Sequence, residues 1–292
     1  MAVLPKPDHD FYAEANVLFA DLQQPLKEKI TPQASVRLPR DGQYQFSQAE
    51  PFRFEGILSH KGGYTQVAGG PSTKIAGFTT LSTSVVEGLN VLDVVTADRV
   101  VAQISTVHPI YGEGQVPSVT FLGTRFDNLR IDGYRVEVER NLEILGPRHD
   151  NDRSYFDDPD VQARVSQQYA RIATAKNLPE WAAKEYPKDR PALIGQGELK
   201  CSVVNGVKGS PGFPFGHVID LPQFGKIFLG ELRVERKLGD PSNGKYDTYR
   251  FRLTMIRLKM GCLADGTVSV TTADSNGGGS QGGGHGTQLG KP

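Results

Sequence analysis

The sequence predicts a mainly β protein, an antiparallel β-sandwich or barrel-like roll that carries a small helical insert. Three observations support this fold class: β-branched side chains dominate residues 82–139, apolar and polar residues alternate there, and turn-forming residues recur. Val, Ile and Thr lose rotamer freedom in a helix but suit a pleated surface. The 33 glycines and 19 prolines imply many turns joined by short connections.

Residues 82–139 show the clearest strand pattern. Val119 and Phe121 alternate with Thr120 and Leu122, as expected for a half-buried strand. Two segments, 88–93 and 128–132, each carry an apolar-polar-apolar triplet that is followed by Asp. Because two such segments fit either two hairpins or two rungs of a solenoid, a β-solenoid is the alternative fold.

The same region contains the run STSVVEGLNVLDVVTADRVVAQIS at residues 82–105 and the segment FDNLRIDG at residues 126–133. On these two segments the chain resembles uncharacterised bacterial proteins and, more distantly, the choice-of-anchor P surface proteins. The resemblance implies no activity and no catalytic residues. Choice-of-anchor P proteins are exported and anchored, whereas this sequence shows neither an export signal nor an anchor.

The chain is predicted to divide into an N-terminal β-rich part (1–145), a loop with a helical insert (146–192), and a β part that completes the same fold (193–273). Residues 274–292 are rich in Gly and predict a flexible tail. Near the N-terminus, Phe11, Ala15, Leu18 and Leu22 lie on one face at helical spacing, so we expect residues 11–22 to form a helix. A strand through the same residues is the alternative.

The helical insert is predicted at residues 158–184. Asp158 suits the N-cap and Pro159 the first helical position. An apolar stripe follows at spacings of four, four and three residues, made of Val161, Val165, Tyr169 and Ile172.

Four strands are predicted after the insert, at residues 199–204, 216–221, 226–236 and 249–260. The turn-forming residues 240–244 join the last two as an antiparallel hairpin. The alternation changes phase near Met255 and Ile256, which predicts a β-bulge at that point.

The amino-acid composition limits the binding partners and the cellular location that we expect for this protein. The 33 Lys and Arg residues balance 33 Asp and Glu residues, so we expect no broad surface for nucleic acid or anionic membranes. No run approaches the ~20 apolar residues of a transmembrane helix, and the N-terminus lacks the pattern of a secretory signal. We therefore expect a cytoplasmic protein, or a surface or exported one if a leader is missing from this sequence.

The two cysteines, Cys201 and Cys262, are predicted to be buried free thiols, with a disulfide as the alternative if their strands are neighbours. No Cys-x-x-Cys or Cys/His cluster suggests a zinc site. The short glycine turns lack the pattern of a phosphate loop, so no cofactor is expected.

An acidic loop before the insert contains His149, Asp150, Asp152 and Asp157, whose side chains are metal ligands in other proteins. The loop lacks the Gly and the closing Glu of an EF-hand. Helix capping already accounts for the acidic residues that follow, so we expect no metal here.

Glu87 and Asp98 lie on or beside strands, where the paired acids of a glycoside hydrolase would lie. Their spacing in the sequence does not fix their separation in space. Ion pairs to nearby arginines such as Arg99 are the favoured interpretation.

Aromatic side chains are interleaved with Arg and Gln in several predicted strands. This pattern favours the core of a sandwich, with an exposed face for carbohydrate or protein as the alternative. The side chains are Tyr44, Phe46, Phe52, Phe54, Tyr64 and Tyr134.

No motif supplies a nucleophile with its base, a metal cage or a phosphate cradle. We therefore expect a non-catalytic structural or binding protein, with a carbohydrate-active hydrolase that uses Glu87 and Asp98 as the alternative. Its expected partner is a second copy of the chain or another protein, and carbohydrate is a further candidate. A homo-oligomer would follow if the apolar rows within 227–232 or 253–258 lay at a sheet edge.

Overall fold

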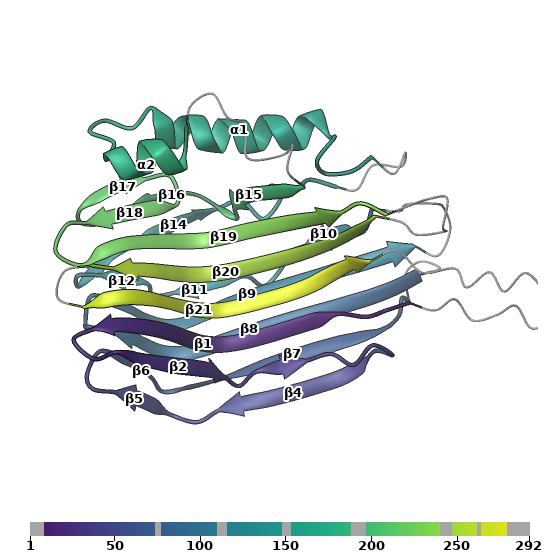
Figure 1. Cartoon of the computed structure of the whole chain (residues 1–292), viewed down its shortest axis with the longest axis horizontal. Coiled ribbons are helices and arrows are strands. Elements are labelled where there is room, and N and C mark those ends of the chain that lie inside the picture. Colours follow the sequence, from purple (N-terminus) through teal and green to yellow (C-terminus); the bar gives the residue numbers. More distant parts are fainter. Residues whose placement is uncertain are drawn as a thin grey trace, which may run out of the picture.

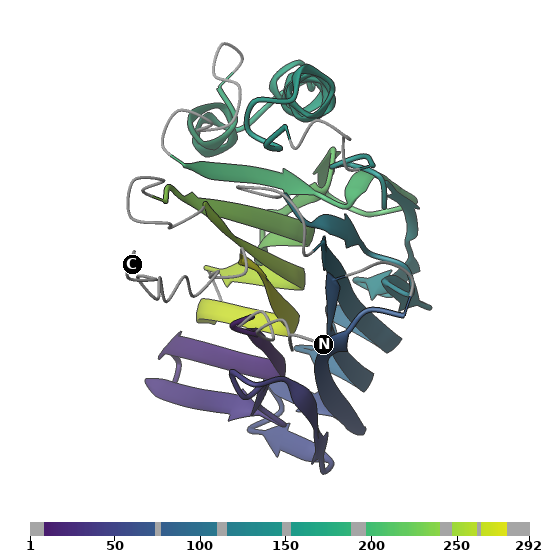
Figure 2. The ribbon, with the colours of Figure 1, turned by 90° about the vertical axis from the view of Figure 1, so that its right-hand side faces the viewer.

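The computed structural model describes residues 9–73, 77–109, 116–147, 153–187, 197–239, 247–261 and 264–278. Two antiparallel sheets pack face to face as a β-sandwich, with two helices at one end (Figures 1 and 2). The predicted fold class is confirmed. Within the described ranges the sheets neither close into a barrel nor wind into a solenoid, so the solenoid alternative is wrong.

The first sheet combines strands from both ends of the sequence. Its path, in spatial order, is β17 (Phe213–Phe215), β18 (Val218–Leu221), β19 (Gly225–Lys237), β20 (Thr248–Met260), β21 (Asp265–Gly278), β1 (Ala13–Gln24) and β2 (Glu28–Gln33). Off this path, β15 (Glu198–Ser202) pairs with β19 and β3 (Val36–Arg37) pairs with β1. The predicted hairpin of the last two long strands is present as β19 and β20.

The second sheet comes from the N-terminal half alone. Its path is β13 (Tyr134–Arg135), β12 (Arg130–Ile131), β9 (Val95–Pro109), β8 (Gly77–Val91), β6 (Leu58–His60) and β5 (Phe52–Phe54). Further strands extend it: β10 (Ser118–Thr120) and β11 (Arg125–Asp127) pair with β9, β7 (Gly62–Pro71) pairs with β8, and β4 (Gln43–Ala49) pairs with β7. The two similar segments of the sequence are turns of two hairpins in this sheet.

A small third sheet and two helices complete the fold. The small sheet pairs β14 (Glu137–Arg140) with β16 (Val204–Lys208). Helix α1 (Pro159–Ala173) begins as predicted, because the Asp158 side chain accepts hydrogen bonds from the backbone of Asp160 and Val161. The whole apolar stripe of α1 is buried, and α2 (Glu180–Glu185) follows it. Neither helix has the length and apolar character needed to cross a membrane.

The prediction of a helix at residues 11–22 is wrong, because β1 occupies this region. Strand β1 pairs with β21 along one edge and with β2 and β3 along the other. Ala15, Asn16, Val17 and Leu18 are all buried, so both faces of the strand are covered. In a strand that is apolar on both faces, apolar and polar residues do not alternate. The apolar residues of β1 therefore matched helical spacing by chance.

The prediction of a tail from residue 274 is also wrong for its first residues. Strand β21 continues to Gly278, and the buried Asp274 carboxylate accepts hydrogen bonds from Arg250 and Arg252 on β20. The backbone N–H of Asn276 donates to the carbonyl of Tyr12. Residues 279–292 lie outside the described part of the chain.

The predicted change of phase at Met255 occurs, but no residue is inserted. Met255 and Ile256 are both buried, so Arg252 and Arg257 share the outer face of the sheet. The neighbouring strands change phase at the same level, at Gly230 on β19 (φ 61°) and Thr271 on β21 (φ 45°). Because three strands change together, the register is kept and charged side chains collect on one face.

Candidate functional site

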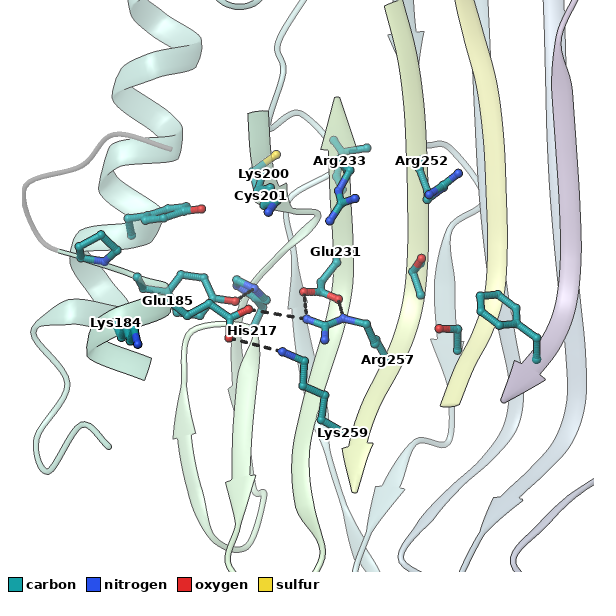
Figure 3. Close-up of a pocket in the computed structure, with 17 residues that line it drawn as sticks. Lys184, Glu185, Lys200, Cys201, His217, Glu231, Arg233, Arg252, Arg257 and Lys259 are labelled. Atoms are coloured by element: carbon teal, nitrogen blue, oxygen red, sulfur yellow. Dashed lines mark hydrogen bonds and ion pairs between the residues drawn. The ribbon is translucent and has the colours of Figure 1, made fainter. Parts of the chain in front are cut away.

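A groove of about 560 Å³ lies on the outer face of the first sheet (Figure 3). Its floor is formed by side chains of β15, β19 and β20, and its wall by Tyr169 of α1 and the residues from Lys184 to Pro187 at the end of α2. We call it the cationic groove, because six basic side chains line it: Lys184, Lys200, Arg233, Arg252, Arg257 and Lys259.

Three of these cations form a row across neighbouring strands. Lys200 on β15 lies directly opposite Arg233 on β19, and Arg233 lies directly opposite Arg252 on β20. Their side chains are 43%, 44% and 38% exposed, so a molecule in solution reaches them. Like charges that face each other on adjacent strands are destabilising. The row therefore requires negative charge close by.

Two carboxylates supply part of that charge. Glu198 accepts from Arg233 at 2.8 Å and lies 3.7 Å from the Lys200 ammonium. Asp274 accepts from Arg252 at 3.0 Å. Glu198 is shared by Lys200 and Arg233, and Asp274 is shared by Arg252 and Arg250. Two carboxylates thus compensate the three cations of the row only in part.

Arg257 and Lys259 belong to a separate, compensated cluster. Nε and Nη2 of Arg257 donate to the two oxygens of Glu231, a bidentate pair. Glu185 at the end of α2 lies 3.9 Å from Arg257 and 3.8 Å from Lys259, and Figure 3 shows these contacts. The Arg257 guanidinium also covers the Phe228 ring at 3.9 Å, so packing fixes its position.

The balance of charge in the groove is positive. Two carboxylates line it with the six cations, and Glu198 and Asp274 reach the row from outside. Six cations against these four carboxylates leave a surplus of two positive charges, although the whole chain has a net charge of zero. Lys184 has no ion-pair partner among the described residues.

The deeper wall of the groove is neutral and partly aromatic. The Tyr186 hydroxyl lies 3.2 Å from Nε2 of His217, and the Tyr169 and Tyr186 rings meet edge to face. Burial lowers the pKa of His217 to about 3, so its imidazole is neutral. Burial also raises the pKa of Tyr186, so its hydroxyl remains protonated.

Cys201 lines the groove as a buried free thiol, as predicted. Burial raises its pKa to about 12, so the thiolate is not formed near neutral pH. The groove therefore brings together no activated nucleophile and base among the described residues. Cys262 lies outside those residues, so the expectation that it is a buried thiol stays a prediction.

The hydrolase candidates Glu87 and Asp98 lie in a different place, on the second sheet. Both line an open pocket of about 420 Å³ together with Lys61, Arg99 and Asp127. Glu87 accepts from Arg99 at 2.6 Å, the ion pair favoured by the sequence, and Asp98 accepts from Asn128 at 3.2 Å. The structure thus brings the two carboxylates to one pocket and gives each a polar partner.

Of the metal candidates, Asp157 lies within the described residues. Asp157 pairs with Arg236 at 2.9 Å, while His149, Asp150 and Asp152 lie outside the described residues. The part of the chain that the structure describes contains no group of three or more side chains able to hold a metal ion.

The expectation that the interleaved aromatic side chains form the core is wrong for three of them. Tyr44, Phe46 and Tyr134 are at least half exposed. Phe52 and Phe54 are partly buried against the core, in agreement with the prediction.

The cationic groove itself was not predicted from the sequence. Its row comes from positions 200, 233 and 252, which no local motif connects. The predicted hairpin of the last two strands was the one signal, because its register places Arg233 opposite Arg252.

The sequence matches the family described as a domain of unknown function (DUF8256) over residues 9–235. The chain belongs to this family. The match ends within β19, so it includes Lys200 and Arg233 of the row, whereas Arg252 follows it. No curated protein and no solved structure matches the chain.

Proposed function

We propose that this protein binds an organic anion in the cationic groove and acts as a binding protein rather than as an enzyme. The observation that supports the proposal is the row of Lys200, Arg233 and Arg252, three cations that face one another on adjacent strands. A ligand with negative charge relieves their repulsion, which an uncharged ligand does not.

The geometry of the row indicates what the ligand carries. Neighbouring strands lie about 4.8 Å apart, so the three cations span about 10 Å. A ligand with two or more carboxylate or phosphate groups at such spacing contacts several of them at once, and the arginines suit these planar or tetrahedral oxyanions. Phe19, Tyr186 and Pro187 add apolar surface for an organic body.

The neutral groups of the groove support binding over catalysis. The Cys201 thiol has its pKa raised to about 12, and the His217 imidazole is neutral and in contact with Tyr186. A nucleophile needs an adjacent base or a lowered pKa. Neither condition is met among the described residues that line the groove.

Calorimetric titration tests the proposal directly. The probes are citrate, inorganic pyrophosphate and an oligosaccharide of uronic acids, with a neutral oligosaccharide of equal length as the control. We expect at least one acidic probe to bind, with an affinity that falls as salt rises because the row is partly exposed. The proposal is contradicted if only the neutral oligosaccharide binds, or if no acidic probe binds at millimolar concentration.

Matched variants locate the site. Lys200→Gln and Arg233→Gln each remove one charge from the row and leave Glu198 with the other partner, so the fold is retained. We expect each to weaken the acidic probe at least about tenfold, or 1.4 kcal/mol. Arg53→Gln, at an exposed position on β5 of the other sheet, is the control that leaves affinity unchanged.

A second candidate function is glycoside hydrolysis in the pocket of Glu87 and Asp98, supported by their shared position in it. Release of reducing ends from a polysaccharide panel tests it. The activity should disappear in both Glu87→Gln and Asp98→Asn, since paired carboxylates act together. Activity that survives either substitution removes this candidate.

A further inference from the structure

The outer edge of the second sheet ends in β4, a strand that differs from the other edge strands. It pairs with β7 on one side, and within the described residues no strand pairs with its other side. Figure 1 shows β4 at the lower boundary of the sandwich, opposite the helices. The backbone N–H and C=O groups of that free side are able to pair with another strand.

The sequence of β4 lacks the usual protection of an edge. Residues 43–49 read QYQFSQA and contain no charged residue, proline or glycine. Four other strands at the ends of the sheets carry charges or prolines: Glu28, Lys29 and Pro32 in β2, Pro214 in β17, Arg53 in β5 and Arg135 in β13. Strand β10 lacks both, but it is only three residues long. Charges and prolines at edges prevent pairing between chains. Among the described edge strands, β4 combines their absence with a length of seven residues, which indicates an edge that is available for pairing.

Exposed aromatic side chains lie along the same strand. Tyr44 is 57% exposed and Phe46 is 50% exposed. The Phe46 ring stacks on Tyr64 of β7 with ring centroids 5.9 Å apart, which holds it in place. Large aromatic side chains that are ordered and exposed are frequent in protein interfaces.

We propose that β4 pairs with β4 of a second copy of this chain, antiparallel and about a two-fold axis at Phe46. The two ten-stranded sheets would then join into one continuous sheet. In this register Phe46 faces Phe46 of the second copy, and Tyr44 faces Gln48. The Tyr64 rings flank the two phenylalanines, so an apolar row of four rings crosses the interface.

The two-fold axis explains why β4 is uncharged. A residue on the axis meets its own copy, so any charge there would face an equal charge. The residues on each side of the axis are also neutral, Gln45 facing Ser47 and Tyr44 facing Gln48. A second copy of the chain is therefore the partner that this edge fits.

The assembly surface differs from the one that the sequence suggested. The apolar rows of β19 and β20 do not lie at an edge, because β19 pairs with β15, β18 and β20, while β20 pairs with β19 and β21. Their large side chains, such as Phe228, Leu229 and Ile256, are buried.

Sedimentation velocity on the full chain tests the pairing. We expect a dimer that dissociates on dilution in the micromolar range, because one added strand pair gives a small interface. Phe46→Lys and Phe46→Glu each place like charges on the axis, and each should weaken the dimer at least about tenfold. Leu238→Lys is the matched control, a 70% exposed leucine outside β4, and it should leave the dimer unchanged.

An equimolar mixture of the two Phe46 variants is the decisive sample. Lys then faces Glu across the axis, so we expect the mixture to dimerise although each variant alone does not. Recovery in the mixture also shows that both variants are folded. A wild-type chain that is monomeric throughout, a dimer that neither substitution weakens, or a mixture that stays monomeric would overturn the proposal.

Discussion

Gln168 of α1 and Ser202 of β15 exchange two hydrogen bonds in the interior of the protein. Oε1 of Gln168 accepts from the backbone N–H of Ser202 at 2.8 Å, and Nε2 donates to the Ser202 carbonyl at 3.0 Å. Nε2 also donates to the carbonyl of Val204 at 3.1 Å. One side-chain amide thus supplies hydrogen-bond partners to the backbone groups at the end of β15. It also attaches the helix that forms the wall of the cationic groove.

Replacement of Gln168 by Leu should therefore destabilise the protein. The leucine fills the space but leaves one buried N–H and two buried carbonyls without this partner, at a cost of about 2 kcal/mol or more in the free energy of unfolding. Urea unfolding measures the loss. Gln167→Leu is the control, because Gln167 is exposed on the same helix, and equal stability of the two variants would contradict the role of the amide.

Gly230 should not tolerate alanine. Its φ of 61° is unfavourable for any side chain, and an added Cβ would lie 2.8 Å from Val203 and 2.9 Å from Val204. Backbone strain and overpacking each cost about 1–3 kcal/mol.

Gly133→Ala separates these two costs in the same urea experiment. Gly133 also has a positive φ, of 78°, but has open space where a Cβ would lie. We expect Gly230→Ala to lose clearly more stability than Gly133→Ala. A smaller loss at Gly230 would show that the sheet relaxes around the added methyl group.

The sequence predicted those parts of the fold in which local pattern and tertiary environment agree. Helix α1 was predicted because Asp158 caps it and its apolar stripe faces the sandwich. Strand β1 was not, because burial of both faces removes the alternation that marks a strand. Its pairing with β21, more than 240 residues away, is a long-range contact that no local window contains.

The candidate site was less predictable than the fold for the same reason. Lys200, Arg233 and Arg252 come from three strands, and only the register of β15, β19 and β20 makes them neighbours. Each of them alone resembles an ordinary exposed cation on a half-buried strand. The prediction that the interleaved aromatic residues form the core failed on β4. Hydrophobicity alone does not show that β4 lies at a sheet edge.

Cys201 should resist alkylation in the native protein. Its thiol is buried and its pKa is raised to about 12, so neither access nor thiolate is available at pH 8. We expect iodoacetamide to label Cys201 only after urea unfolds the chain, as measured by peptide mass spectrometry. Peptide mapping separates Cys201 from Cys262, and rapid labelling of Cys201 in the native protein would show that the groove opens.

His9 should make the protein less stable in acid. The ring stacks on Phe78 at 4.5 Å and lies 4.9 Å from His108, and within the described residues neither of its nitrogens has a hydrogen-bond partner. Burial lowers the pKa of His9 to about 4, and the nearby Asp10 offsets only part of this effect. A histidine in the unfolded chain has a pKa of about 6.5.

The sign of the pH dependence follows from this difference. Between pH 6.5 and about 4 the unfolded chain binds a proton that folded His9 does not, so the free energy of unfolding falls as the pH falls. We expect His9→Phe, which keeps the stacking on Phe78, to remove about 2–3 kcal/mol of this fall. Urea unfolding of both proteins at pH 7.5 and pH 4.5 provides the measurement. The difference between the proteins cancels the contribution of carboxylates far from His9. Burial is the larger cause of the lowered pKa of His108, which stays below the pH range of the experiment at about 3. Equal falls in the two proteins would show that His9 does not titrate as its burial requires.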